Sequence, residues 1–181
     1  MKPVRIDDFE DPRIDDYRNL KDAALAASRG RFIVEGRGNL RVLLTESSFA
    51  PESILLSGRA FHAMAPEIEG WVLHCPLWVA PQVVLDRIVG FPIHRGVLAV
   101  CERGPSTDPL ELAKRSLTGK PAPRLIVLEG LTNHDNVGGI FRNAMALGGT
   151  GVLLCPRSCD PLYRKAIRTS MGGSLCVPFA R

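Results

Sequence analysis

A polar stretch in the last third of the chain carries the side chains best suited to chemistry. Asn136, Gly138 and Arg142 follow closely on an apolar run, Leu125–Leu128. If this stretch is helical, the side chain of Arg142 leans back over Gly138, towards Asn136. A helix start also favours an anion, because its N–H groups are free and its dipole is positive there. The spacing therefore predicts that Asn136, Gly138 and Arg142 converge on a phosphate and an adjacent hydroxyl. A solvated arginine beside a capping asparagine is the alternative.

The predicted helix runs from Val137 to Leu147, with Asp135 or Asn136 as its N-cap. Gly148-Gly149 is predicted to end it. Four apolar residues recur at helical spacing and should form its buried face: Val137, Ile140, Phe141 and Ala144.

The surrounding sequence predicts a βαβαβ unit with a parallel sheet. Strand Leu125–Leu128 precedes the helix, and strand Gly151–Cys155 follows it. A second helix is expected to start at Asp160-Pro161, an acidic cap followed by proline, and to stop at Gly172-Gly173. Leu175–Val177 should begin the third strand.

The N-terminal part of the chain also alternates between short apolar runs and helical patterns, which favours an α/β layer fold. Its expected strands are Phe32–Glu35, Ser53–Leu56, Gly70–His74 and Val97–Cys101. Its expected helices are Ile14–Gly30, Gly38–Thr45, Arg59–Ala65 and Pro76–Val89. Proline and glycine then flank a short helix, Leu110–Leu117, which indicates a linker with a boundary near residue 121.

Composition bounds the class of protein. The chain has 181 residues, of which 45% are hydrophobic, and a net charge of +4. It contains no apolar run of the roughly 20 residues that cross a bilayer and no apolar N-terminal leader, so we expect a cytoplasmic protein without a membrane partner. The five cysteines lack zinc-site spacing, so no metal is expected.

Two segments resemble motifs of a known family. Asn136-x-Gly138-x-x-x-Arg142-Asn143-Ala144 resembles motif 1 of the SpoU (TrmH-like) branch of the SPOUT RNA methyltransferases. Ile167–Gly173 resembles the start of motif 2. Upstream, Phe32–Gly36 and His94–Val97 resemble the opening and closing strands of the substrate-binding domain that often precedes the catalytic domain. The family often has Asp-Pro where this chain has Asn133-His134, which alters the turn before motif 1.

The resemblance implies an α/β architecture in two parts. An L30e-like RNA substrate-binding domain would span 1–104, and a linker would span 105–121. Residues 122–181 would form the first part of a SPOUT α/β-knot domain, a parallel sheet from which the knot region is absent. In the family, motif 3 and the knot complete the S-adenosylmethionine site. We therefore expect most of that site to lie beyond Arg181, and the chain as given to be inactive.

The resemblance also implies a reaction, methyl transfer from S-adenosylmethionine to a ribose 2′-OH of rRNA or tRNA. Arg142 and Asn136 would be the catalytic residues. An arginine keeps its proton at neutral pH, so Arg142 would clamp the phosphate and stabilise the developing alkoxide rather than act as a base. Asn136 would orient the hydroxyl. The complete protein would be a homodimer.

Other residues receive supporting roles. Glu129 would position Arg142, or would be a solvated charge at a strand end. His134 could touch the substrate, or be an exposed loop histidine. The remaining assignments are support for motif 1 by Gly138 and Asn143, the cofactor loop by Arg168, Ser170 and Gly172, and RNA binding by Arg37, Arg41, Arg164 and Lys165.

Two other classes of function stay open. One is a non-catalytic RNA-binding protein that uses the L30e-like domain. The other is a small-molecule α/β enzyme with an anion site.

Overall fold

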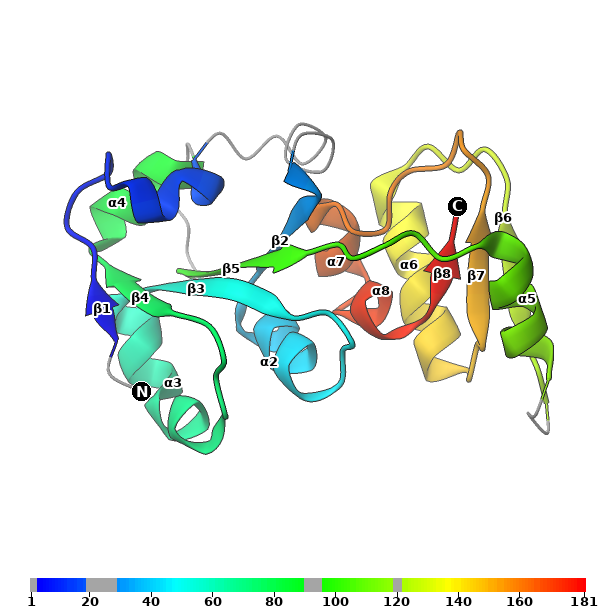
Figure 1. Cartoon of the computed structure of the whole chain (residues 1–181), viewed down its shortest axis with the longest axis horizontal. Coiled ribbons are helices and arrows are strands. Elements are labelled where there is room, and N and C mark those ends of the chain that lie inside the picture. The colour runs from blue at the N-terminus through cyan, green and yellow to red at the C-terminus, as the bar shows by residue number, and fades with distance from the viewer. Residues whose placement is uncertain (1–2, 19–28, 90–95, 119–121) are drawn as a thin grey trace.

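Two β-sheets form the framework of the described residues, one in each half of the chain (Figure 1). The computed structural model describes residues 3–18, 29–89, 96–118 and 122–181. The first sheet has the strand order β1-β4-β3-β5-β2, and the second has the order β6-β7-β8. We call the part that carries β1 to β5 the first half, and the part from α5 to β8 the second half.

The first half is a mixed sheet with helices on its faces. Its strands are β1 (Val4–Arg5), β2 (Arg31–Glu35), β3 (Pro51–Ser57), β4 (Leu77–Ala80) and β5 (Val97–Glu102). β4 runs parallel to β1 and β3, whereas β5 runs antiparallel to β2 and β3. Its helices are η1 (Pro12–Tyr17), a 3-10 helix, and α2 (Arg37–Thr45), α3 (Gly58–Gly70) and α4 (Gln82–Val89). Alternate strand residues face opposite sides, so Val34 and Leu56 join one buried cluster and Ile33 and Leu55 join another.

Two sequence predictions for this half are wrong. Gly70–His74 is not a strand, because Gly70 ends α3 and the strand is Leu77–Ala80. The predicted helix Pro76–Val89 therefore divides into a strand and a helix. Pro81 separates them, and its carbonyl accepts from the N–H groups of Val84 and Leu85 at the start of α4. Parallel pairing of Trp78 with Leu55 then holds the strand in the sheet.

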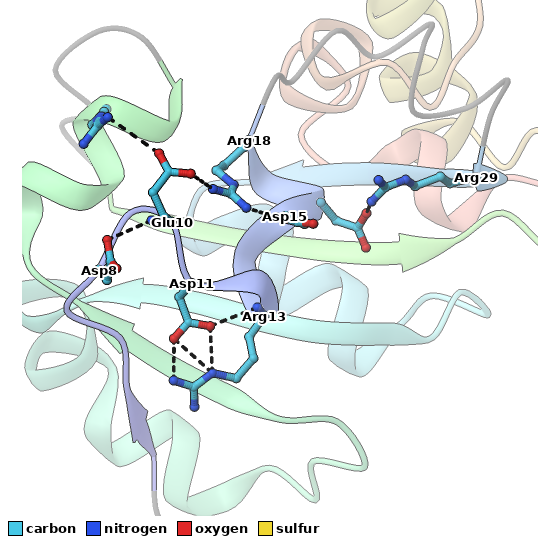
Figure 2. Close-up of polar contacts among 9 residues, drawn as sticks. Asp8, Glu10, Asp11, Arg13, Asp15, Arg18 and Arg29 are labelled. Carbon is cyan, nitrogen blue, oxygen red and sulfur yellow. Dashed lines mark hydrogen bonds and ion pairs between the residues drawn. The ribbon is translucent and has the colours of Figure 1, made fainter.

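The predicted N-terminal helix Ile14–Gly30 is described only at its two ends, since residues 19–28 lie outside the described residues. Ion pairs lie on the surface of the described part. Figure 2 shows Asp11 facing Arg13, and Glu10 paired with Arg18. The Arg13 contacts lower the pKa of Asp11 to about 2. Exposed pairs of this kind stabilise little. Burial of Ile14 and Tyr17 anchors the segment instead, and the Tyr17 hydroxyl lies 2.8 Å from that of Ser53.

The second half confirms the predicted βαβαβ unit and its parallel sheet. Strands β6 (Leu125–Leu128), β7 (Gly151–Leu154) and β8 (Phe179–Ala180) pair in parallel. Helix α6 (His134–Ala146) covers one face, and α5 (Pro109–Leu117) covers the other (Figure 1). The predicted buried face of α6 is also confirmed, with Val137 and Phe141 fully buried.

The later elements of this half begin elsewhere than predicted. Helix α7 (Arg164–Thr169) starts after Asp160 and not at it, because the Asp160 carboxylate accepts from the N–H of Leu162 at 2.8 Å and closes a turn. The segment Leu175–Val177 is not a strand. Gly172 takes a left-handed φ of 87° and starts a short helix, α8 (Gly173–Cys176), so the third strand is delayed to Phe179.

The two halves pack against each other without a break in the apolar interior. Leu162, Ile167 and Leu175 of the second half belong to the same buried cluster as Leu40 and Leu43 of α2. The Ser47 hydroxyl donates to the carbonyl of Leu175 at 2.8 Å. Arg103 and the buried Asp160 form an ion pair at 2.6 Å. Helices α7 and α8 are therefore held from both sides, by α6 and by the first half.

No helix among the described residues is both long enough and apolar enough to span a membrane. Residues 90–95, which include His94 and Arg95 of the predicted closing strand, lie outside the described residues.

Candidate functional site

The start of α6 is capped differently from the prediction. The cap is Asn133, whose side-chain oxygen accepts from the N–H groups of Asp135 at 2.8 Å and Asn136 at 3.2 Å. Asp135 and Asn136 therefore lie inside the first turn, because the altered turn before motif 1 supplies its own capping side chain. Two of the N–H groups expected to meet an anion are already occupied.

Gly138 is a packing position. A Cβ atom there would lie 2.6 Å from the carbonyl oxygen of Ala166 and 2.8 Å from Cβ of Thr169. The space beside Gly138, where the Arg142 side chain was predicted to lie, is thus occupied by α7. One turn further along α6, α8 makes a similar contact. A Cβ on Gly173, the first residue of α8, would lie 2.9 Å from the carbonyl oxygen of Phe141. Glycines therefore let α6, α7 and α8 meet backbone to backbone.

Arg142 is exposed on the side of α6 that borders α7 and α8. A Cβ on Gly173 would come within 3.3 Å of its Cα atom. Its guanidinium forms no hydrogen bond or ion pair with the described residues. Asn136 is also exposed, but six residues correspond to about 240° of helical rotation, so it occupies a different face of α6 from Arg142. The structure brings Gly138 and Arg142 to one side and leaves Asn136 apart from them.

Opposite charges tie the starts of α6 and α7 together. The Asp135 carboxylate accepts from Lys165 at 2.7 Å and from the Thr169 hydroxyl at 3.0 Å. These contacts hold the pKa of Asp135 below its ordinary value. Arg168 lies 4.0 Å from Glu35 of β2. With Arg164 at the start of α7, three basic side chains lie along this helix, and the carboxylates of Asp135 and Glu35 lie beside two of them.

Glu129 contacts a different arginine from the one predicted. It lies at the carboxyl end of β6 and pairs with Arg157 at 3.6 Å, with both side chains strongly exposed. It does not reach Arg142, because α6 turns that residue towards α7 and α8. Asn143 is exposed on α6, and its side chain makes no hydrogen bond with the described residues.

The predicted cofactor-loop residues are engaged within the protein. The buried Ser170 hydroxyl donates to the carbonyl of Ile167 at 2.9 Å and accepts from the N–H of Ser174 at 3.2 Å. Gly172 is buried, and a Cβ there would lie 2.8 Å from the Val42 side chain of α2. Both residues shape the turn between α7 and α8.

The two arginines predicted to bind RNA on α2 share one carboxylate. Arg37 and Arg41 both contact Oε1 of Glu67, the latter at 3.0 Å. Their hydrogen bonds hold the pKa of Glu67 below its ordinary value. Both guanidinium groups remain about half exposed, so they stay accessible at the surface.

Sequence reasoning did not predict the surroundings of one thiol in the second half, that of Cys155 just after β7. The hydrogen bond between its thiol and the Ser158 hydroxyl, 3.5 Å apart, and the hydrogen bond from the N–H of Gly130 lower its pKa to about 7. Burial instead raises the pKa of Cys75, Cys159 and Cys176. A cysteine at the carboxyl end of a strand was the only signal in the sequence, and the partners of the thiol depend on the fold.

We expect Cys155 to be the described cysteine that iodoacetamide alkylates first at neutral pH, because the thiolate is the nucleophile. Ser158→Ala should raise the pKa of Cys155 towards its ordinary value and slow the reaction. Mass spectrometry of alkylation rates across pH measures both effects. Faster alkylation of Cys159 or Cys176 would contradict the prediction.

Comparison with known proteins assigns the second half to a family. Residues 123–181 match the SpoU rRNA Methylase family. An uncharacterized tRNA/rRNA methyltransferase of Mycobacterium bovis is 35% identical over 177 residues, covering 96% of this chain and 59% of that protein. A further uncharacterized tRNA/rRNA methyltransferase, of Mycobacterium avium, is 32% identical over 101 residues, which are 56% of this chain and 32% of that protein.

Solved structures share the fold. The AdoMet-bound rRNA methyltransferase of Sinorhizobium meliloti superposes with a TM-score of 0.75 at 18% identity, covering 98% of this chain and 64% of that one. An RNA 2′-O ribose methyltransferase gives 0.71 at 22% identity, covering 98% and 65%. The SpoU methyltransferase AviRb of Streptomyces viridochromogenes, in complex with AdoMet, gives 0.69 at 21% identity, covering 94% and 61%.

The chain spans 59% of the length of the first of these relatives. The matched segment contains β6, α6, β7, α7, α8 and β8, and with them the exposed Arg142 and the glycine-packed turn after α7. Residues 123–181 therefore match the SpoU rRNA Methylase family, and both halves of the chain are similar to tRNA/rRNA methyltransferases.

Proposed function

We propose that the protein containing this chain transfers a methyl group from S-adenosylmethionine to a ribose 2′-OH of rRNA or tRNA. The observation that carries the proposal is Arg142. It is exposed in the motif 1 helix, borders the motif 2 turn, and has no partner among the described residues. A guanidinium that the fold leaves exposed and unpaired suits an anionic ligand.

In this proposal Arg142 acts by charge and geometry. Its planar fork can hold a phosphate through two hydrogen bonds and keep the neighbouring ribose in place. The same positive charge favours the oxygen anion that develops as the 2′-OH attacks. Asn136 would meet the RNA from a different face of α6, with Asn143 beside it on the exposed surface.

The cofactor would supply the methyl group. The described residues fit it only in part, because the motif 2 groups assigned to it, Ser170 and Gly172, are satisfied within the protein. We propose that Ser170 and Gly172 shape the turn between α7 and α8, and that the exposed residues of α6 and α7 bind RNA. The cofactor proposal is supported by the two AdoMet-bound proteins that share the fold.

Other RNA contacts would come from both halves. Arg164 and Lys165 of α7 and Arg37 and Arg41 of α2 are the candidates for phosphate binding. We further propose, from the family resemblance, that the complete protein is a homodimer. The competing proposal is that the protein binds RNA through the first half and catalyses no reaction.

Methyl transfer by the complete protein tests the proposal. We expect tritium from methyl-labelled S-adenosylmethionine to enter rRNA or tRNA. The modified nucleotide should then resist alkaline cleavage, which needs a free 2′-OH. Salt-dependent RNA binding without transfer would favour the non-catalytic function, and label on a base would contradict ribose as the target.

A further inference from the structure

Two aromatic rings stack where α6 and α7 begin. The imidazole of His134, the first residue of α6, lies 5.0 Å from the ring of Tyr163, with an interplanar angle of 25°. Tyr163 is the N-cap residue of α7, but its side chain does not cap the helix. Both residues remain partly exposed, so the ring pair is not enclosed in the core.

Each ring carries a polar atom that makes no hydrogen bond with the described residues. Nε2 of His134 is buried without a hydrogen-bond partner, and the Tyr163 hydroxyl makes no hydrogen bond with the described residues. Buried polar groups in folded proteins are nearly always paired, so an unpaired one calls for a specific explanation. The imidazole is therefore held by its stacking on Tyr163 and not by a hydrogen bond of Nε2.

The ring pair lies on the same side of α6 as the proposed phosphate clamp. His134, Gly138 and Arg142 follow one another at four-residue spacing and all border α7 or α8. Arg142 lies two turns after His134, about 12 Å along the helix axis. Its side chain leans back towards the start of the helix, which shortens that separation.

Basic side chains follow the rings on α7. Arg164 and Lys165 directly follow Tyr163, and Arg168 lies one turn further on. Asp135 pairs with Lys165, and Glu35 lies 4.0 Å from Arg168. Stackable rings next to basic side chains are the combination by which proteins hold single-stranded nucleic acid, since bases stack and phosphates pair.

We propose that His134 and Tyr163 form a stacking platform for a base of the RNA, next to the nucleotide held by Arg142. This inference rests on the proposed function. It adds a contact to the base itself, which motif 1 does not supply. It also gives a role to His134, which stands where the family often has proline.

Equilibrium binding of a single-stranded oligoribonucleotide of about ten nucleotides to the chain tests the platform. Tyr163→Leu should weaken binding about 5- to 150-fold, because it removes a π-face without removing charge. Tyr163→Phe keeps the ring and should bind like the unmodified chain. The slope of log affinity against log salt should be unchanged in both variants, whereas Lys165→Ala should reduce it by about 1.

A second measurement does not depend on a variant folding. An otherwise identical oligoribonucleotide that lacks bases should bind the unmodified chain more weakly, and Tyr163→Leu should not weaken that binding further. Equal affinity of Tyr163→Leu and the unmodified chain for the intact RNA would overturn the platform alone. So would an equal loss in Tyr163→Phe. Absence of any salt-dependent RNA binding would overturn the platform and the proposed function together.

Discussion

Arg142→Ala in the complete protein is expected to abolish methyl transfer to RNA and to leave the fold intact. The side chain is exposed and has no partner among the described residues, so its removal costs little folding energy. Loss of one group that stabilises developing charge typically lowers kcat by about 10²- to 10³-fold. Single-turnover transfer of labelled methyl groups and thermal unfolding would measure the two quantities.

A matched variant controls for the loss of charge. Arg115→Ala removes an exposed arginine from α5, which covers the opposite face of the second sheet (Figure 1). It should leave transfer unchanged. Arg142→Lys should restore little activity, since a lysine keeps the charge but lacks the planar fork. Full activity of Arg142→Ala, or an equal loss in Arg115→Ala, would remove Arg142 from the reaction.

Gly138→Ala is expected to destabilise the protein by about 1–3 kcal/mol, because the new methyl group has no space. It would lie 2.6 Å from the carbonyl oxygen of Ala166 and 3.0 Å from the backbone nitrogen of Ser170. These are backbone atoms of α7 and its C-terminal cap, so neither can move aside as a flexible side chain would. Urea unfolding, followed by circular dichroism, measures the free energy of unfolding.

The neighbouring glycine provides the control. A Cβ on Gly139 meets nothing within 4 Å, although it belongs to the same helix. Gly139→Ala should therefore stabilise the protein by about 0.5–1 kcal/mol, the helix preference of alanine over glycine. The same substitution at adjacent positions should thus have opposite signs. Two equal effects would mean that α6 and α7 do not meet at Gly138.

The elements that the sequence predicted well are those with a clear local period. Strand Leu125–Leu128 is a continuous apolar run bounded by turn residues, and the structure has it at the same residues. The buried face of α6 follows the helical period of Val137, Phe141 and Ala144. The errors arose at local signals with two meanings. Pro81 divides an apolar stretch into strand and helix, and Asp160 resembles a helix cap but forms a turn and an ion pair with Arg103.

The candidate site divides in the same way. Motif spacing predicted that Arg142 and Gly138 lie at the site. In the structure Arg142 is exposed, and Gly138 is buried against α7. Spacing along the chain could not show that Glu129 pairs with Arg157, or that Asp135 holds Lys165. These pairs join residues from separate elements, and only the packing of those elements determines which charges meet.

The sequence by itself determined the parallel sheet of the second half, the helix that carries motif 1, and the family to which they point. Apolar period and glycine or proline placement act over a few residues, so they can be recognised without a fold. The tertiary structure alone decided that Gly138 packs against the backbone of α7 and that His134 stacks on Tyr163. It also decided that hydrogen bonds lower the pKa of Cys155. Each of these depends on a partner brought from elsewhere in the chain, and the close packing of α6, α7 and α8 selects that partner.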